Sequence, residues 1–148
     1  MTHLTLSAAI RVPNDLSEDQ MKRDFENAWI CLRRKLPGIA CRSSRADDLE
    51  KHYVLRYIVP GSEEDLKSWI SETVFFTDCT ETLEKLNTHL KDDHWWKQSE
   101  NRYVTELHVS PSQDQNEWHV RCVSRIFPCT SLSVMLICSQ FELRAQQR

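Results

Sequence analysis

The chain has 148 residues, of which 40% are hydrophobic and 28% are charged, and this composition is typical of one globular domain. Its formal net charge of -3 gives no basic surface for a polyanion, so we expect no nucleic-acid partner. It contains only two glycines, which excludes a phosphate-binding loop or dinucleotide fingerprint, and we therefore expect no nucleotide cofactor.

Targeting and redox signals are also lacking. No apolar run approaches the roughly 18 residues needed to span a bilayer, and the first twenty residues do not have the pattern of a secretion signal. The six cysteines contain no Cys-x-x-Cys spacing, which favours reduced thiols over a disulfide framework. We expect a soluble, cytoplasmic protein without a membrane partner.

The first predicted elements are a strand and a helix. Residues 3–12 alternate loosely between apolar and polar and end at Pro13, which predicts a strand. Ser17 and Gln20 have the spacing of a capping box, and apolar residues then recur at helical intervals up to the Pro37-Gly38 turn. The pattern predicts a helix with one apolar face.

Two strands and two helices follow. A short strand over 39–42 and a longer one over 53–59 can pair as a hairpin. Ser62 to Asp65 is a second capping box, and it begins a helix whose apolar face we assign to Leu66, Trp69, Ile70 and Val74. A third helix is predicted over 80–90.

The last part of the chain reads as a loop, two strands and a helix. Residues 91–101 are polar and connecting, strands are predicted over 103–109 and 118–127, and a helix runs from 130 or 131 to about 145. This order predicts an α/β fold, a two-layer mixed sheet with helices on one face. We expect a single domain over residues 1–148.

This order of elements is similar to the N-terminal half of the chloramphenicol-acetyltransferase-like superfamily, which includes condensation domains and fungal acyl-CoA-dependent O-acyltransferases. In that superfamily the first helix commonly ends in a His-Pro-x-Leu-like turn, and Leu36-Pro37-Gly38-Ile39 stands in its place here. The resemblance covers nearly the whole chain. It implies half of that fold and, for the superfamily, acyl transfer from a thioester in secondary metabolism.

The resemblance also locates the superfamily's active-site motif, His-x-x-x-Asp-Gly, whose histidine is the general base. By position the histidine falls on Arg125, the aspartate on Cys129 and the glycine on Thr130. Arginine has a pKa above ~12 and stays protonated, so Arg125 cannot accept a proton at neutral pH. The predicted active site is therefore degenerate and lacks its base.

Other candidate residues do not replace that base. Cys129 has no base near it in sequence, which favours a buried inert thiol. The literal His89-x-x-x-Asp93 lies at a predicted helix end and not after a strand. His119 and Arg121 share a strand face with Arg125, and the resemblance implies that they would line the superfamily's substrate channel. His119 is roughly 20 Å from position 125 along the strand, however, and cannot easily substitute for the base. No pair of histidines has the spacing of a metal site, so we expect no metal.

These observations predict a truncated acyltransferase-like protein without the usual acyl-CoA transfer activity. Two alternatives stay open: a recruited enzyme that cyclises or rearranges a metabolite in the inherited pocket, and a non-catalytic interaction domain. A lone half of the fold would leave a sheet face and a sheet edge uncovered. The expected partners are therefore a small-molecule metabolite, a second copy of the chain or a full-length relative.

Overall fold

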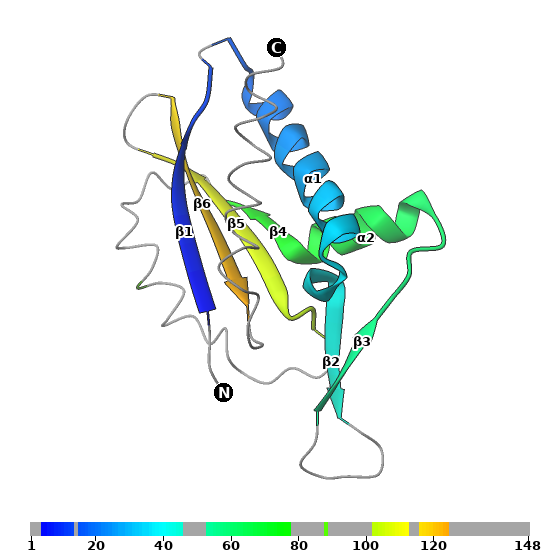
Figure 1. Cartoon of the computed structure of the whole chain (residues 1–148). Helices are drawn as coiled ribbons and strands as arrows, with labels where there is room; N and C mark the ends of the chain where they lie inside the picture. The colour runs from blue at the N-terminus through cyan, green and yellow to red at the C-terminus, as the bar shows by residue number, and fades with distance from the viewer. Residues whose placement is uncertain are drawn as a thin grey trace.

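The structure is a computed structural model that describes residues 4–13, 15–45, 53–77, 88, 102–112 and 116–124. Within these residues the strands form two sheets, a four-stranded sheet in the order β1-β6-β5-β4 and a two-stranded sheet β2-β3 (Figure 1). The strands are β1 (Leu4–Arg11), β2 (Cys41–Arg45), β3 (Tyr53–Tyr57), β4 (Val74–Phe76), β5 (Thr105–Pro111) and β6 (Glu117–Ser124).

The centre of the larger sheet is the hairpin of β5 and β6, in which Leu107 lies opposite Cys122. β1 pairs antiparallel with the outer edge of β6, so that Leu6 also lies opposite Cys122. β4 pairs parallel with the other side of β5. The sheet is therefore mixed, as predicted, and it joins the first described strand to the last one.

The helices α1 (Glu18–Lys35) and α2 (Glu63–Thr73) both begin at the predicted capping boxes. The Gln20 backbone N–H donates to Ser17 Oγ at 3.2 Å, and the Ser17 N–H donates back to the Gln20 side chain. Ser62 and Asp65 repeat this exchange at the start of α2. Each box satisfies two backbone donors that the first turn of a helix leaves unpaired.

Both helices pack against the same face of the sheet, where Trp29 of α1 stacks on Trp69 of α2 with a centroid distance of 5.9 Å. The Trp29 indole N–H donates to the Thr73 hydroxyl at 3.1 Å, so its polar group is paired within the core. These residues join Leu107 and Val120 in one buried cluster. The α/β prediction with helices on one face is confirmed.

Several predicted boundaries are wrong. The strands predicted over 53–59 and 103–109 are Tyr53–Tyr57 and Thr105–Pro111. The strand expected over 39–42 begins only at Cys41, because Pro37–Ala40 forms the 3-10 helix η1, closed by the Ile39 N–H on the Leu36 carbonyl. Proline favours this turn since its φ is already fixed near the helical value. Val74, assigned to the second helix, instead begins β4 and pairs with Leu107.

Several predicted elements lie outside the described residues, namely the helix over 80–90, the loop over 91–101, residues 125–127 of the last strand and the C-terminal helix. Cys31, Cys41 and Cys122 carry thiols. No helix in the described part of the chain combines the length and the apolar character needed to cross a membrane.

Candidate functional site: the polar face of the central sheet

The two faces of the four-stranded sheet differ in chemistry. Side chains alternate between the faces along each strand, and Leu107, Val109 and Val120 face the helices. The opposite face, which we call the polar sheet face, carries nine polar residues in addition to Ala9, Phe75 and Val123. They are Thr5, Ser7 and Arg11 on β1, Glu106, His108 and Ser110 on β5, and Glu117, His119 and Arg121 on β6.

Arg121 lies near the middle of the polar sheet face and has no exposed surface. It sits in register between Ser7 on β1 and His108 on β5, and its Nε donates to Ser7 Oγ at 3.4 Å. Burial lowers the pKa of Arg121 to about 10, because a desolvated cation is costly. The guanidinium is still protonated at neutral pH and places a buried positive charge on this face.

A carboxylate and an imidazole lie together beside Arg121. His108 Nε2 is 3.2 Å from Glu106 Oε2, and only 12% and 7% of these two side chains are exposed. The His108 ring also stacks on Phe75 with a centroid distance of 5.0 Å. A carboxylate that accepts from one ring nitrogen fixes the orientation of the imidazole.

The third feature is a pair of buried polar atoms without partners. Ser110 and His119 lie directly opposite each other on β5 and β6, and in the described part of the chain neither Ser110 Oγ nor His119 Nδ1 has a hydrogen-bond partner. His119 Nε2 lies 3.6 Å from Glu117 Oε1. A buried polar atom left unpaired costs about 1–3 kcal/mol. A hydroxyl or carboxylate placed between the two atoms would satisfy both.

The structure brings together both sequence-predicted pocket residues that it describes. His119 and Arg121 lie on one sheet face, as predicted, and Ser7, Glu106, His108 and Ser110 join them. Glu106, His108 and Ser110 could have been found from the sequence, because they alternate with the apolar Leu107 and Val109 along β5. Arg125, Cys129, Thr130 and His89 lie outside the described residues. No cluster of three metal-ligating side chains occurs among residues that the structure describes.

Comparison with known proteins finds no matching family model and no matching curated protein. Solved structures do match. The TRI3 trichothecene 15-O-acetyltransferase of Fusarium sporotrichioides matches with a TM-score of 0.66 and 18% identity, over 82% of this chain and 26% of that chain. The wax ester synthase/diacylglycerol acyltransferase of Marinobacter aquaeolei VT8 matches with a TM-score of 0.53 and 14% identity, over 90% of this chain and 31% of that chain.

A condensation domain that mediates chain release from the enacyloxin polyketide synthase also matches, with a TM-score of 0.50 and 14% identity, over 96% of this chain and 25% of that chain. These neighbours share the chloramphenicol-acetyltransferase-like fold, and the chain has the fold of a half-domain of it. The fold prediction drawn from the resemblance is confirmed. The chain spans only about a quarter to a third of the length of these neighbours.

Proposed function

We propose that this chain is an acyltransferase-like protein that binds a small-molecule metabolite on the polar sheet face. The observation that supports binding is the pair Ser110 Oγ and His119 Nδ1. These buried polar atoms lie on facing positions next to Arg121 and have no hydrogen-bond partner among the residues that the structure describes. A metabolite with a carboxylate or hydroxyl group supplies acceptors for Arg121 and for a serine hydroxyl. The trichothecene named for one structural neighbour supports a role in secondary metabolism.

We further propose that the chain does not transfer acyl groups from coenzyme A through a histidine base. The superfamily's base position is occupied by Arg125, which remains protonated at neutral pH. His119 lies six positions earlier in the sequence, a separation that would span about 20 Å in an extended strand. We therefore do not expect His119 to replace the base. The activity of the full-length neighbours is therefore not transferred to this chain.

Binding is tested by protein NMR titration with a panel of hydroxy acids and their methyl esters. We expect the acids to shift the amide signals of β5 and β6, and the esters to bind more weakly because they lose the charge that Arg121 recognises. Ser110→Ala and Arg121→Met should weaken binding at least tenfold. Ser71→Ala, an exposed serine on α2, serves as the matched control. Equal shifts in all four proteins would exclude the polar sheet face as the binding site.

Acyl transfer is tested by the release of free coenzyme A from acetyl-CoA in the presence of alcohols. We expect no release above the rate without protein. If the unmodified chain acylates an alcohol and Arg125→Ala abolishes that reaction, the proposal is wrong. Acyl transfer that arises in Arg125→His would support the positional assignment of the lost base.

A second candidate function is catalysis on a metabolite without a cofactor. The Glu106–His108 contact favours it, since a buried carboxylate and imidazole at 3.2 Å can move a proton during a cyclisation or rearrangement. Mass spectrometry of isotope-labelled candidate metabolites would detect turnover. His108→Gln should then remove turnover while binding is retained. A protein that only binds would release every labelled molecule unchanged.

A further inference from the structure

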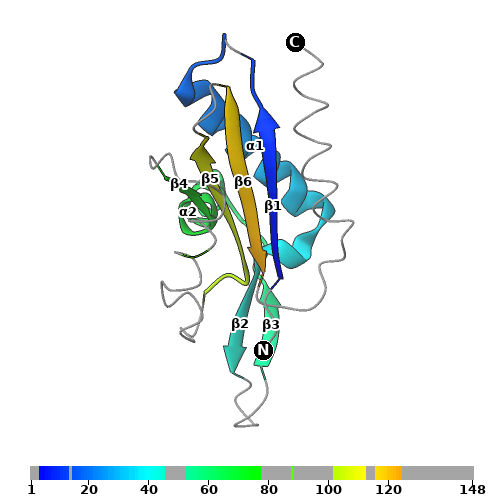
Figure 2. The same cartoon turned by 90° about the vertical axis from the view of Figure 1, so that its left-hand side faces the viewer.

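The β2-β3 hairpin extends beyond the four-stranded sheet and away from α1 (Figures 1 and 2). β2 contacts the main body through backbone bonds with residues 102–104, whereas β3 forms the outer strand. Within the described residues, no strand pairs with the free edge of β3. Such an edge presents unpaired N–H and C=O groups to any extended chain.

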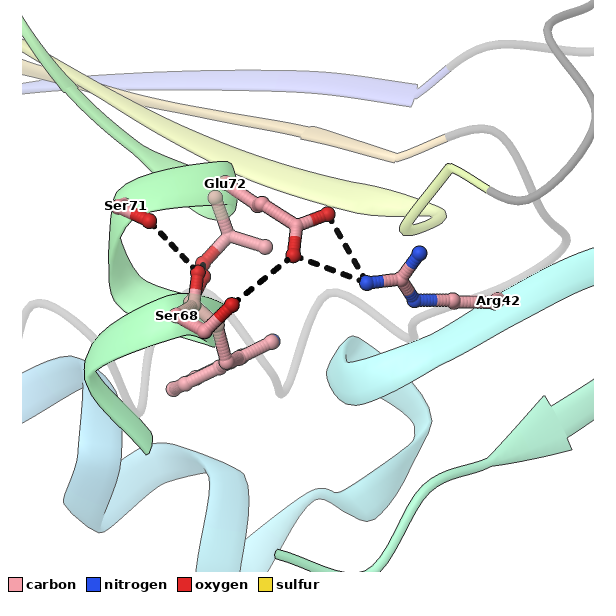
Figure 3. Close-up of polar contacts among 6 residues, drawn as sticks. Arg42, Ser68, Ser71 and Glu72 are labelled. Atoms are coloured by element: carbon pink, nitrogen blue, oxygen red, sulfur yellow. Dashed lines mark hydrogen bonds and ion pairs between the residues drawn. The ribbon is translucent and has the colours of Figure 1, made fainter. Parts of the chain in front are cut away.

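The hairpin is nevertheless held firmly at its base. Arg42 of β2 donates to both carboxylate oxygens of Glu72 on α2 at 2.9 Å, and Ser68 contacts the same carboxylate (Figure 3). Burial lowers the pKa of Arg42, but its contacts with Tyr103 and Glu72 outweigh this effect and keep the pKa above its ordinary value. The Arg42 guanidinium is therefore protonated at every pH that a cell experiences.

A second anchor holds the end of β3. Arg33 of α1 is buried and donates to the Ile58 carbonyl, while its guanidinium lies over the rings of Tyr57 and Trp69 at 5.5 and 4.5 Å. Because both ends of the hairpin base are fixed, the free edge of β3 is a preformed surface. A partner strand that adds to it pays little ordering entropy on this side.

The residues along this edge are apolar and exposed. Val54, Leu55, Tyr57, Ile58 and Val59 have 37%, 47%, 41%, 46% and 74% of their surface exposed. Val54, Leu55 and Tyr57 belong to β3, and Ile58 and Val59 follow its end. Three exposed, large apolar side chains in a five-residue strand are unusual on a free edge, where proteins normally place charges or proline. Arg56 is the one charged residue within β3.

The hydrogen-bond pattern identifies which backbone groups are available. The Val104 N–H donates to the Cys41 carbonyl, and the Ser43 N–H donates to the Arg102 carbonyl, so the groups of Cys41 and Ser43 point away from β3. Their cross-strand partners in β3 are Tyr57 and Leu55. In an antiparallel ladder such residues point their own N–H and C=O outward. Leu55 and Tyr57 therefore present the free donors and acceptors of the edge.

We propose that β3 pairs antiparallel with β3 of a second copy of this chain, about a twofold axis at Leu55. This register places Leu55 opposite Leu55 of the second copy, and it places Arg56 opposite Val54. The outward-pointing residues then face one another, as the ladder requires. A register centred on Arg56 would set two arginines directly opposite each other, which is unfavourable. Because Leu55 is the middle residue of Tyr53–Tyr57, the register centred on Leu55 also pairs all five residues of β3.

The apolar and preformed character of the β3 edge also favours a second copy of this chain as the partner. A second copy carries an equally apolar and preformed edge, and the twofold axis lets both copies bury the same residues. One added strand gives an interface below about 1,200 Å², so we expect a weak dimer that forms with rising concentration. The interface does not use the polar sheet face, and its test is independent of metabolite binding.

Sedimentation velocity between about 5 and 500 µM should show a monomer converting to a dimer. Leu55→Lys, which sets two lysines against each other on the axis, should raise the dissociation constant at least tenfold. The matched control is Val59→Lys, a more exposed position outside the strand, which should leave dimerisation within threefold of the original. Circular dichroism verifies that both variants fold. A monomer at all concentrations, or an equal effect of both variants, would overturn the proposal.

Two further measurements test the edge itself. Hydrogen exchange of the Leu55 and Tyr57 amides should slow with protein concentration, whereas the Arg56 amide, which faces β2, should be protected throughout. Dimerisation should also persist between 50 and 500 mM salt, since it is apolar and brings two Arg56 side chains onto one face. A dimer that dissociates over this salt range, or protection that does not depend on concentration, would contradict β3 self-pairing and favour an acidic partner segment.

Discussion

At the scale of single residues, Thr73 links the two stacked tryptophans of the core. Its hydroxyl accepts from the Trp29 indole and donates to the Trp69 carbonyl at 2.7 Å, and the residue has no exposed surface. Thr73→Val has almost the same shape but leaves the Trp29 N–H unpaired. We expect a loss of about 1–3 kcal/mol in the free energy of unfolding, measured by urea denaturation. Thr73→Ser keeps the hydroxyl, and it should lose clearly less than the valine variant does.

Arg121 makes stability depend on pH in an unusual direction. Burial lowers its pKa to about 10 in the folded chain, well below the ordinary value of an arginine, so above pH 10 the unfolded chain binds more protons than the folded one. Stability contributed by this residue therefore rises with pH, by about 1 kcal/mol at pH 10.5. We expect the unfolding free energy of the natural chain to increase relative to Arg121→Met between pH 8 and 10.5. Exposed Arg56→Met should show no such change, and a fall with pH would contradict the assignment.

At the scale of elements, the two capping boxes determine where the helices begin. Ser17→Ala and Ser62→Ala each remove an acceptor for a first-turn N–H, and each should cost about 1 kcal/mol in thermal or urea unfolding. Ser71→Ala is a suitable control within α2, because the exposed Ser71 hydroxyl donates to the Ser68 carbonyl and does not cap the helix. Equal losses in all three variants would show that the effect comes from the helix interior and not from capping.

The helix starts could be predicted from sequence because capping is local, and the strands of the β5-β6 hairpin because side-chain alternation is local. Two elements could not. The 3-10 turn at Pro37 and the strand at Val74 both depend on neighbours: Val74 leaves the helix to pair with Leu107 of β5. An apolar residue at a helical interval satisfies either structure, and only the distant strand decides between them.

The candidate site was partly predictable for the same reason. His119 and Arg121 follow from alternation along β6, but their neighbours Ser110 and His108 depend on the register of β5 against β6. A shift of one residue would turn every one of these side chains to the other face. Side-chain alternation predicts the face on which each residue lies. The residue opposite it depends on the strand register, which is fixed by the conformation of the hairpin loop, and the sequence pattern does not reveal that conformation.

At the scale of the whole molecule, the larger sheet depends on β1 to cover the edge of β6. Removal of residues 1–12 should leave that edge open, and it also removes Ile10 and Val12, which pack against the hydrophobic core. We expect the shortened chain to aggregate and to bind a hydrophobic dye, followed by fluorescence and light scattering. Removal of residues 1–3, which precede β1, is the control. A soluble, cooperatively unfolding chain without β1 would contradict this role.

The same pairing has a consequence for synthesis. Leu4 pairs with Ser124 and Arg11 pairs with Glu117, so β1 is synthesised more than a hundred positions before its partner strand. At ordinary translation speeds this delay lasts roughly 6 to 20 s, during which β1 has no β6 to pair with. Contacts of such long sequence separation also form slowly after release. We therefore expect the yield of the newly made chain to depend on the translation rate as well as on the final stability.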